Sequence, residues 1–309
     1  MNYRRALPAT GALALLVTLA GATTAMTAAS TTTCVGAAAR DPHHPCTNLS
    51  RTVSPQKGDD ALYPSTFDCK ATLQRPRPVC TFGAPLRGSK ATIALVGDSH
   101  ALHWRAALDI VAKAKRWRAF SMTTAACQFS AVKFVEAFRA LCRPWYAQAR
   151  RWFADHPQVS TVFVSQKTIT LVAPVPGKTE AQARAAGFVR AWATLPKTVK
   201  RIIVLRDVPN PLDGIFSCID EAVATGMPAL SVACPSPREG SLLPDAAVAA
   251  AHALNSKRYR VIDLSSLFCT WRQCFPVIGG VQVYADVVGH ITAAYMRTVA
   301  PFLLRRLGG

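Results

Sequence analysis

Residues 93–100 read IALVGDSH and place a serine directly after a short apolar run. Four consecutive apolar residues, 93–96, are typical of a strand that is buried on both faces, and Gly97 permits a tight exit from it. Asp98 and Ser99 are both favoured at the start of a helix. The stretch therefore predicts a strand, a turn and a helix, with the Ser99 hydroxyl at the carboxyl edge of the sheet, where open α/β folds bind ligands.

A second signal lies late in the chain, at Asp286 and His290. A serine hydroxyl is a poor nucleophile until a neutral imidazole takes its proton, and a carboxylate must hold that imidazole in one tautomer. We therefore predict Ser99 as nucleophile, His290 as base and Asp286 as the residue that orients His290. Either Ser99 or His290 alone is explained equally well by a structural role, Ser99 as a helix cap and His290 as a hydrogen-bonded histidine.

These segments resemble the SGNH hydrolase family, in which Gly-Asp-Ser carries the nucleophile and a late Asp-x-x-His carries acid and base. The resemblance is strongest to the SGNH domain associated with acyltransferase-3 type enzymes of bacterial surface polysaccharides. It rests on GDSHALHW at 97–104, TTAACQF at 123–129 and CTWRQCFPVIGGVQVYAD at 269–286, and it covers most of the chain beyond residue 60. It implies an SGNH-like, flavodoxin-like three-layer fold and an acyl-enzyme mechanism.

The spacing of the acid and the base departs from the family pattern, because three residues separate Asp286 from His290 instead of two. Gly289 can adopt backbone angles that other residues avoid, so a bulge before His290 would still bring both side chains together. Asp263, at the end of the RVIDL strand, is the alternative carboxylate.

The remaining site residues are less distinctive. The tetrahedral intermediate of acyl transfer needs hydrogen-bond donors, and we expect the backbone N–H of Ser99, the loop around Ala126 and the amide of Gln166 to supply them. The glycine and asparagine that the family often uses for this purpose are not plainly present. Asp98 and His100 are expected to line the pocket. No zinc-type ligand spacing occurs, so we expect no metal and no cofactor.

Strand-like and helix-like segments alternate from residue 91 onward. Apolar runs occur at 91–96, 118–122, 160–165, 201–205 and 260–264, and helical patterns occur near 101–115, 141–154, 179–194, 244–254 and 292–305. This alternation predicts an α/β fold with a central parallel sheet of about five strands, covered by helices on both faces. In the first helix, the spacing of Leu102, Ala106, Ile110 and Ala114 predicts the buried stripe, with Arg105 on the solvated side.

The chain divides into three predicted parts. Residues 1–30 have a basic start, an apolar stretch and small residues, which indicates a signal peptide or an N-terminal anchor. Residues 31–90 form a loop-rich, disulfide-bonded lead-in that packs as a strap on the catalytic domain, residues 91–309. The ten cysteines suit an exported protein, and we predict pairing between neighbours in sequence: Cys34–Cys46, Cys69–Cys80, Cys127–Cys142, Cys218–Cys234 and Cys269–Cys274.

The net charge of +19 suits anionic neighbours at the cell exterior, although the basic residues are dispersed along the sequence. Nucleic-acid binding is not expected of an exported, disulfide-bonded chain. The resemblance implies an extracytoplasmic serine O-acyltransferase, with acetyl as the expected group and a cell-surface glycan as acceptor. A separate membrane acyltransferase is the expected acyl donor. An esterase of the same mechanism and a non-catalytic glycan- or partner-binding domain remain the alternatives.

Overall fold

A six-stranded sheet forms the centre of the protein in this computed structural model, which describes residues 34–44, 46, 48, 52–55, 79–227 and 230–308. The strand order is β1-β3-β2-β4-β5-β7. Five strands are mutually parallel and β1 is antiparallel to β3. The bounds are β1 Cys80–Gly83, β2 Ala91–Gly97, β3 Trp117–Thr123, β4 Val159–Ser165, β5 Arg201–Leu205 and β7 Tyr259–Ile262.

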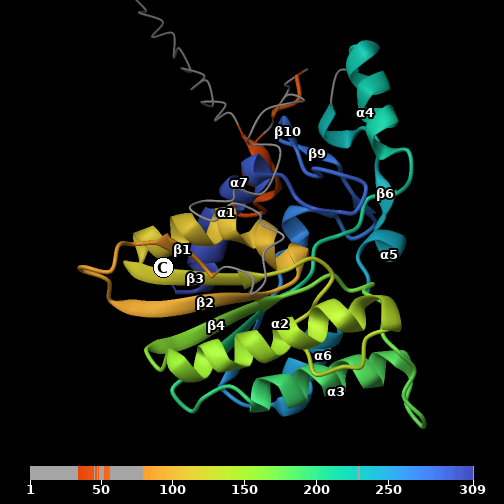
Figure 1. Cartoon of the computed structure of the whole chain (residues 1–309). Helices are drawn as coiled ribbons and strands as arrows, with labels where there is room; N and C mark the ends of the chain where they lie inside the picture. The colour runs from red at the N-terminus through yellow and green to blue at the C-terminus, as the bar shows by residue number, and fades with distance from the viewer. Residues whose placement is uncertain are drawn as a thin grey trace, which may run out of the picture. The chain divides into compact units, whose positions relative to one another are not determined.

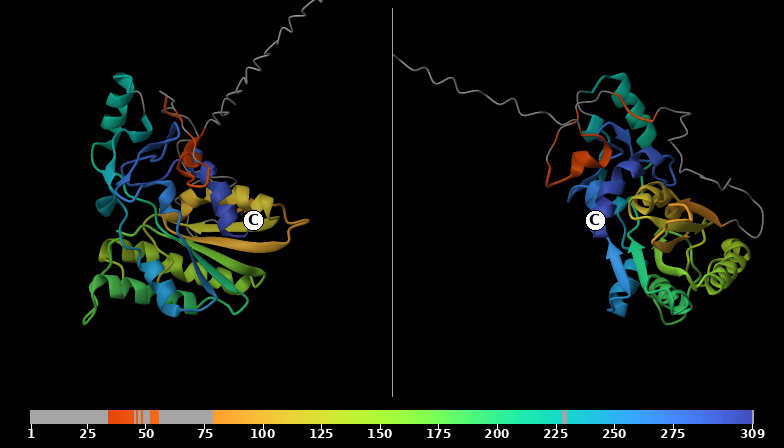
Figure 2. Two further views of the ribbon diagram at one scale, coloured as in Figure 1. Left: turned by 180° about the vertical axis from the view of Figure 1, so that it is seen from behind. Right: turned by 90° about the vertical axis from the view of Figure 1, so that its left-hand side faces the viewer.

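Helices cover both faces of this sheet, as the alternating sequence pattern predicts (Figure 1). The helices on one face are α1 (Ser99–Ala114) and α7 (Ala293–Arg306), and those on the other are α2 (Glu136–Asp155), α3 (Glu180–Ala193) and α6 (Ala246–Leu254). Strand β2 serves both layers because its side chains alternate: Ile93 and Leu95 pack with α1 and α7, whereas Ala94 and Val96 pack with the other three helices. Figure 2 shows the same three layers from two further directions.

The order of the parallel strands determines where the candidate site lies. Strand β2 lies between β3 and β4, and the chain then proceeds outward through β5 and β7, which is the flavodoxin-like order. The direction of chain progression thus reverses at β2, and ligands of such sheets bind at the carboxyl end of this reversal. Ser99 follows β2 there, so the predicted fold class and the predicted position of the serine are both confirmed.

Two larger elements were not predicted from the sequence. Strand β1 lies within the predicted lead-in and adds a sixth strand at the sheet edge, and helix α4 (Ile215–Ala224) packs in a small separate cluster with Leu230 and Val277. The smaller elements are η1 (Gly36–Arg40), η3 (Leu230–Val232), β6 (Ser236–Pro237), α5 (Arg238–Ser241), η4 (Ser265–Leu267), β8 (Gln273–Cys274), β9 (Val277–Ile278) and β10 (Val281–Gln282).

The predicted buried stripe of α1 is partly wrong. Ile110 is 41% exposed, whereas Arg105 is only 2% exposed and Trp104 and Leu108 are fully buried. Helix α7 packs closely along α1, and β1 also contacts α1, with Asp109 accepting the N–H of Gly83 at 2.9 Å. Burial on α1 therefore depends on segments that are distant in the chain.

Four of the five predicted disulfides are present: Cys34–Cys46, Cys127–Cys142, Cys218–Cys234 and Cys269–Cys274. Cys69, the predicted partner of Cys80, lies outside the described residues, as does the predicted export segment, residues 1–30. Within the described ranges, no helix combines the length and the apolar character needed to cross a bilayer.

Exposed basic residues gather at the amino ends of the parallel strands, opposite to the edge that carries Ser99. Lys90 precedes β2, Arg116 precedes β3, and Lys200 and Arg201 lie at the start of β5, with the half-buried Arg258 just before β7. Residues that are dispersed in the sequence are thus brought together by the parallel topology.

Candidate active site

Ser99 is the first residue of α1 and follows a turn that only glycine fits. A Cβ on Gly97 would lie 1.9 Å from the carbonyl oxygen of Ser165 in β4, so a larger residue would separate β2 from β4. Asp98 caps α1 by accepting a hydrogen bond from the backbone N–H of His100 at 2.9 Å. This strand, glycine turn and capped helix confirm the local structure expected from residues 93–100 and leave Ser99 half-buried at the sheet edge.

Asp98 joins two elements behind Ser99. Its carboxylate also accepts the backbone N–H of Lys167, which follows β4, at 2.9 and 3.1 Å. Burial raises the pKa of Asp98, although hydrogen bonds and the nearby His100 oppose this effect. Both residues predicted to line the pocket, Asp98 and His100, are completely buried. They support the residues around them and do not face solvent.

Asp286 and His290 meet within one short loop. Oδ2 of Asp286 lies 2.6 Å from Nδ1 of His290, and Oδ1 accepts the backbone N–H groups of Val288, Gly289 and His290 at 3.0–3.2 Å. Partial burial raises the pKa of Asp286, but the hydrogen bonds and the charge of His290 outweigh this effect and hold it below its usual value.

The extra residue between Asp286 and His290 is accommodated by Gly289, as the sequence suggested. Gly289 has φ +96°, a conformation that strongly favours glycine. A Cβ at this position would lie 3.1 Å from Cδ of Pro211 and 3.7 Å from Cε1 of His100. The residue is therefore constrained both by its backbone angles and by the close approach of Pro211, which follows β5.

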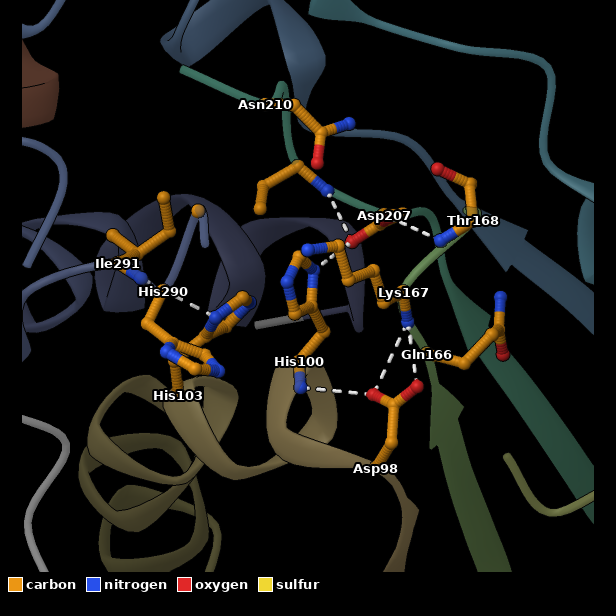
Figure 3. Close-up of polar contacts among 12 residues, drawn as sticks. Asp98, His100, His103, Gln166, Lys167, Thr168, Asp207, Asn210, His290 and Ile291 are labelled. Atoms are coloured by element: carbon orange, nitrogen blue, oxygen red, sulfur yellow. Dashed lines mark hydrogen bonds and ion pairs between the residues drawn. The ribbon is translucent and has the colours of Figure 1, made fainter. Parts of the chain in front are cut away.

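Three histidine rings cluster beside the start of α1 (Figure 3). The ring of His290 lies 5.6 Å from that of His100, centroid to centroid, in an edge-on arrangement, and His100 lies 5.2 Å from His103. His103 Nδ1 accepts the N–H of Ile291 at 3.4 Å, and burial lowers the pKa of His103 well below its usual value, with the neighbouring His100 and His290 adding to this effect. His103 is therefore neutral and structural.

His290 faces the site with its second ring nitrogen. Nε2 of His290 is buried and has no hydrogen-bond partner among the described residues. No hydrogen bond joins Ser99 to His290 within these residues either, so the structure brings Asp286 and His290 together but leaves Ser99 without a bond to His290. Such bonds are often long without substrate and tighten in the reacting complex.

The structure contains a second histidine–carboxylate pair that the sequence analysis missed. Nδ1 of the fully buried His100 lies 2.6 Å from Oδ1 of Asp207, whose Oδ2 accepts the N–H of Thr168 at 2.8 Å. Burial lowers the pKa of His100, but the charge and hydrogen bond of Asp207 raise it more, so that the net shift is upward. Asp207 lies two residues beyond the end of β5, and this position at the sheet edge was the available signal.

The predicted oxyanion donors differ in their surroundings. The N–H groups of Ser99 and Ala126 have no acceptor in the described part of the chain, and Ala126 has φ +60° in the turn after β3, next to Gly97. The side-chain nitrogen of Gln166 donates instead to Asp245 at 3.0 Å, and Figure 3 shows this side chain extending away from His100. All three remain predictions as oxyanion donors, and Gln166 is the least available.

Two further carboxylates have structural contacts. Asp263, the alternative partner for His290, pairs instead with Arg206 at 2.7 Å and accepts the N–H of Ser265. Asp245 caps α6 and also accepts the N–H of Asp207 at 3.0 Å, and burial raises its pKa to about 6. No group of three metal-binding side chains occurs in the described residues.

Comparison with known proteins identifies the family. The family described as "SGNH domain (fused to AT3 domains)" matches residues 65–305, most of the chain. The chain belongs to this SGNH domain family. This membership supports an activity of the acyltransferase or esterase type. No curated protein matches the chain.

A solved structure has the same SGNH-like fold. It is the periplasmic domain of a lipopolysaccharide acetyltransferase from Salmonella ser. Paratyphi A, with a TM-score of 0.52 at 14% identity over 71% of this chain and 84% of that chain. This likeness establishes the fold of the SGNH domain. The disulfides are consistent with an extracytoplasmic location, because such bonds persist in oxidising compartments.

Proposed function

We propose that the protein is an extracytoplasmic serine O-acyltransferase that transfers an acyl group, acetyl in the simplest case, to a hydroxyl of a cell-surface glycan. The hydrogen bond of 2.6 Å between Asp286 and His290 carries this proposal, because it fixes an imidazole beside the helix start that bears Ser99.

The reaction follows from these groups. His290 Nε2 takes the proton of Ser99 as Oγ attacks the acyl carbonyl, and Asp286 stabilises the imidazolium that forms. The N–H groups at the start of α1 and in the turn after β3 would receive the oxyanion. The protonated His290 then gives its proton to the leaving group, and an acyl-serine remains. A glycan hydroxyl, deprotonated by His290, attacks this ester; the bond to Ser99 Oγ breaks, His290 returns the proton to that oxygen, and the acylated glycan leaves.

The acyl donor is proposed to be supplied by an AT3-type membrane acyltransferase, because the family description pairs this domain with AT3 domains. Hydrolysis is the second candidate. Water can attack the acyl-serine in place of the glycan hydroxyl, and the same residues would then act as an esterase. The ratio of acylated glycan to free carboxylate released therefore distinguishes transferase from esterase.

The test compares wild type with Ser99→Ala and His290→Ala on p-nitrophenyl acetate, together with labelling by a fluorophosphonate. Ser89→Ala is the matched control, because the Ser89 hydroxyl is partly exposed and bonds to the Leu86 carbonyl, away from the candidate site. We expect Ser99→Ala and His290→Ala to abolish hydrolysis, and the label to map to Ser99. Equal rates in all four proteins with no labelling would show a non-catalytic binding domain.

A further inference from the structure

An exposed tryptophan stands beside a cavity on the flank of the domain. Trp271 is 76% exposed, which is unusual for so large an apolar side chain. It borders a cavity of about 640 Å³, a volume in the range of small-molecule sites. Neither the nucleophile nor the base of the proposed reaction lines this cavity.

The tryptophan is held in place by a rigid hairpin. A disulfide joins Cys269 to Cys274, and between them the N–H of Thr270 donates to the Gln273 carbonyl at 2.7 Å. The guanidinium of Arg272 lies 3.9 Å from the centre of the Trp271 ring. A ring that is already ordered loses little entropy when a ligand binds, so this hairpin presents a preorganised flat surface.

Two arginines give the cavity its charge. Arg238 reaches the carbonyl of Thr270 and the hydroxyl of Ser265 at 3.0 and 3.3 Å. Arg40, on the opposite wall, lies over the Phe275 ring at 4.2 Å, and its Nη2 is buried without a hydrogen-bond partner in the described chain.

The acidic residue of the lining does not cancel this charge. Asp41 already pairs with Arg305 at 2.9 Å. The lining is thus positive, and its two guanidinium groups match a carboxylate or phosphate group.

The cavity adjoins the sheet edge that bears the candidate active site. Ser265, in its lining, follows β7, three strands along the sheet from β2 and Ser99. Adjacent strands are about 4.8 Å apart, so the two strand ends are separated by roughly 14 Å. An extended chain of several sugar units can span this distance.

We propose that this cavity, formed by Arg40, Arg238, Thr270 and Trp271, binds an anionic saccharide unit of the acceptor glycan, at a distance from the hydroxyl that is acylated. The sugar ring stacks on Trp271, its carboxylate or phosphate contacts Arg40, and one of its hydroxyl groups bonds to the exposed Ser266. The proposal rests on the proposed function for the nature of the ligand, but not for its binding.

Calorimetry on the full chain provides the test. The probes are trigalacturonate, its carboxyl-reduced neutral counterpart and inorganic phosphate. Trp271→Ala changes an exposed hairpin tip and Arg40→Gln removes a charge that has no hydrogen bond at Nη2, so both variants are expected to fold, and melting curves check this. Arg201→Gln, an exposed arginine at the start of β5, is the matched charge control.

We expect trigalacturonate to bind at least tenfold more tightly than the neutral trisaccharide. Trp271→Ala and Arg40→Gln should each weaken trigalacturonate binding at least tenfold, and Arg201→Gln less than twofold. Equal loss in Arg201→Gln would show general attraction to a basic protein and would overturn the proposal. Phosphate binding as tight as that of trigalacturonate would also overturn it, since Trp271 would then have no role.

These experiments distinguish a failure of the cavity proposal from a failure of the proposed function. Binding of trigalacturonate without ester hydrolysis would uphold the cavity and refute the proposed function. Hydrolysis that depends on Ser99, without any binding of trigalacturonate at the cavity, would do the reverse.

Discussion

Replacing Asp286 by Asn tests whether this carboxylate orients and stabilises the catalytic imidazole. Asn keeps an oxygen that can accept the N–H groups of Val288, Gly289 and His290, so the loop retains its turn. The amide cannot stabilise an imidazolium, and its NH₂ group favours the wrong tautomer of His290. The substitution therefore removes charge while leaving the backbone geometry in place.

The size of the effect follows from the contact. Two opposite charges about 4 Å apart interact by about 4 kcal/mol at an effective dielectric constant of 20. The side chains are 35% and 22% exposed, so screening by solvent reduces this to about 2 kcal/mol. Loss of tautomer control adds about 1 kcal/mol. The total of about 3 kcal/mol corresponds to a fall in kcat/KM of about 150-fold.

The assay is hydrolysis of p-nitrophenyl acetate at pH 6, 7.5 and 9. The pKa of Asp286 is held below its usual value, so the carboxylate is charged at all three pH values and the loss should be similar at each. Asp263→Asn is the matched control, because Asp263 forms an equally short ion pair, at 2.7 Å, with Arg206. A loss below threefold in Asp286→Asn, or an equal loss in Asp263→Asn, would refute the reasoning.

Three further substitutions test the surrounding structure. Gly289→Ala should cost about 1–2 kcal/mol in strain and lower kcat/KM at least tenfold, because φ +96° no longer suits the residue; wild-type kinetics would contradict this. Asp207→Asn should lower the free energy of unfolding by about 3 kcal/mol at pH 5, where His100 is charged, and by less once the pH exceeds the folded pKa of His100. The pKa of His100 is raised in the folded state, so this stabilisation is complete at pH values below the unfolded-state pKa and is lost as the pH rises through the folded-state pKa. Urea titrations that show the opposite pH trend would contradict the assignment. Replacing Cys127 and Cys142 by Ala opens a disulfide of sequence separation 15 and should lower stability by about 3 kcal/mol and Tm by roughly 6–12 °C; an unchanged Tm in calorimetry would argue against it.

Local patterns predicted most of the fold. The strand at Ile93 and the helix start at Ser99 need only short-range information, namely an apolar run, a glycine and a cap. The same is true of Gly289, whose freedom explained the unusual spacing before His290. These features are determined by residues that are neighbours in sequence.

The features that sequence reasoning missed depend on distant contacts. Asp207 became relevant only when β5 brought it to His100, 107 residues earlier in the chain. Arg105 is buried and Ile110 is exposed, against expectation, because burial on α1 depends on the packing of distant elements such as α7 and β1. Strand β1 is four residues long and gains its ladder only by pairing with β3, so its own sequence carries little signal.

In the loop that carries Asp286 and His290, different contacts determine the orientation of the His290 ring and its distance from Ser99. A bridge between Tyr284 and Ile291 closes the loop, and the bond from Asp286 to His290 lies wholly inside it. Its attachment to the rest of the site is different in kind: the Lys167 ammonium donates to the Val288 carbonyl at 2.8 Å, and Gly289 rests against His100. The orientation of the His290 ring relative to Asp286 is thus determined within six consecutive residues, 285–290. The distance from this ring to the Ser99 hydroxyl depends instead on how the loop packs against its neighbours. Substitutions that shift the loop could therefore change the distance between His290 and Ser99, and with it the preference for a glycan or water as acceptor. They would leave the bond between Asp286 and His290 intact.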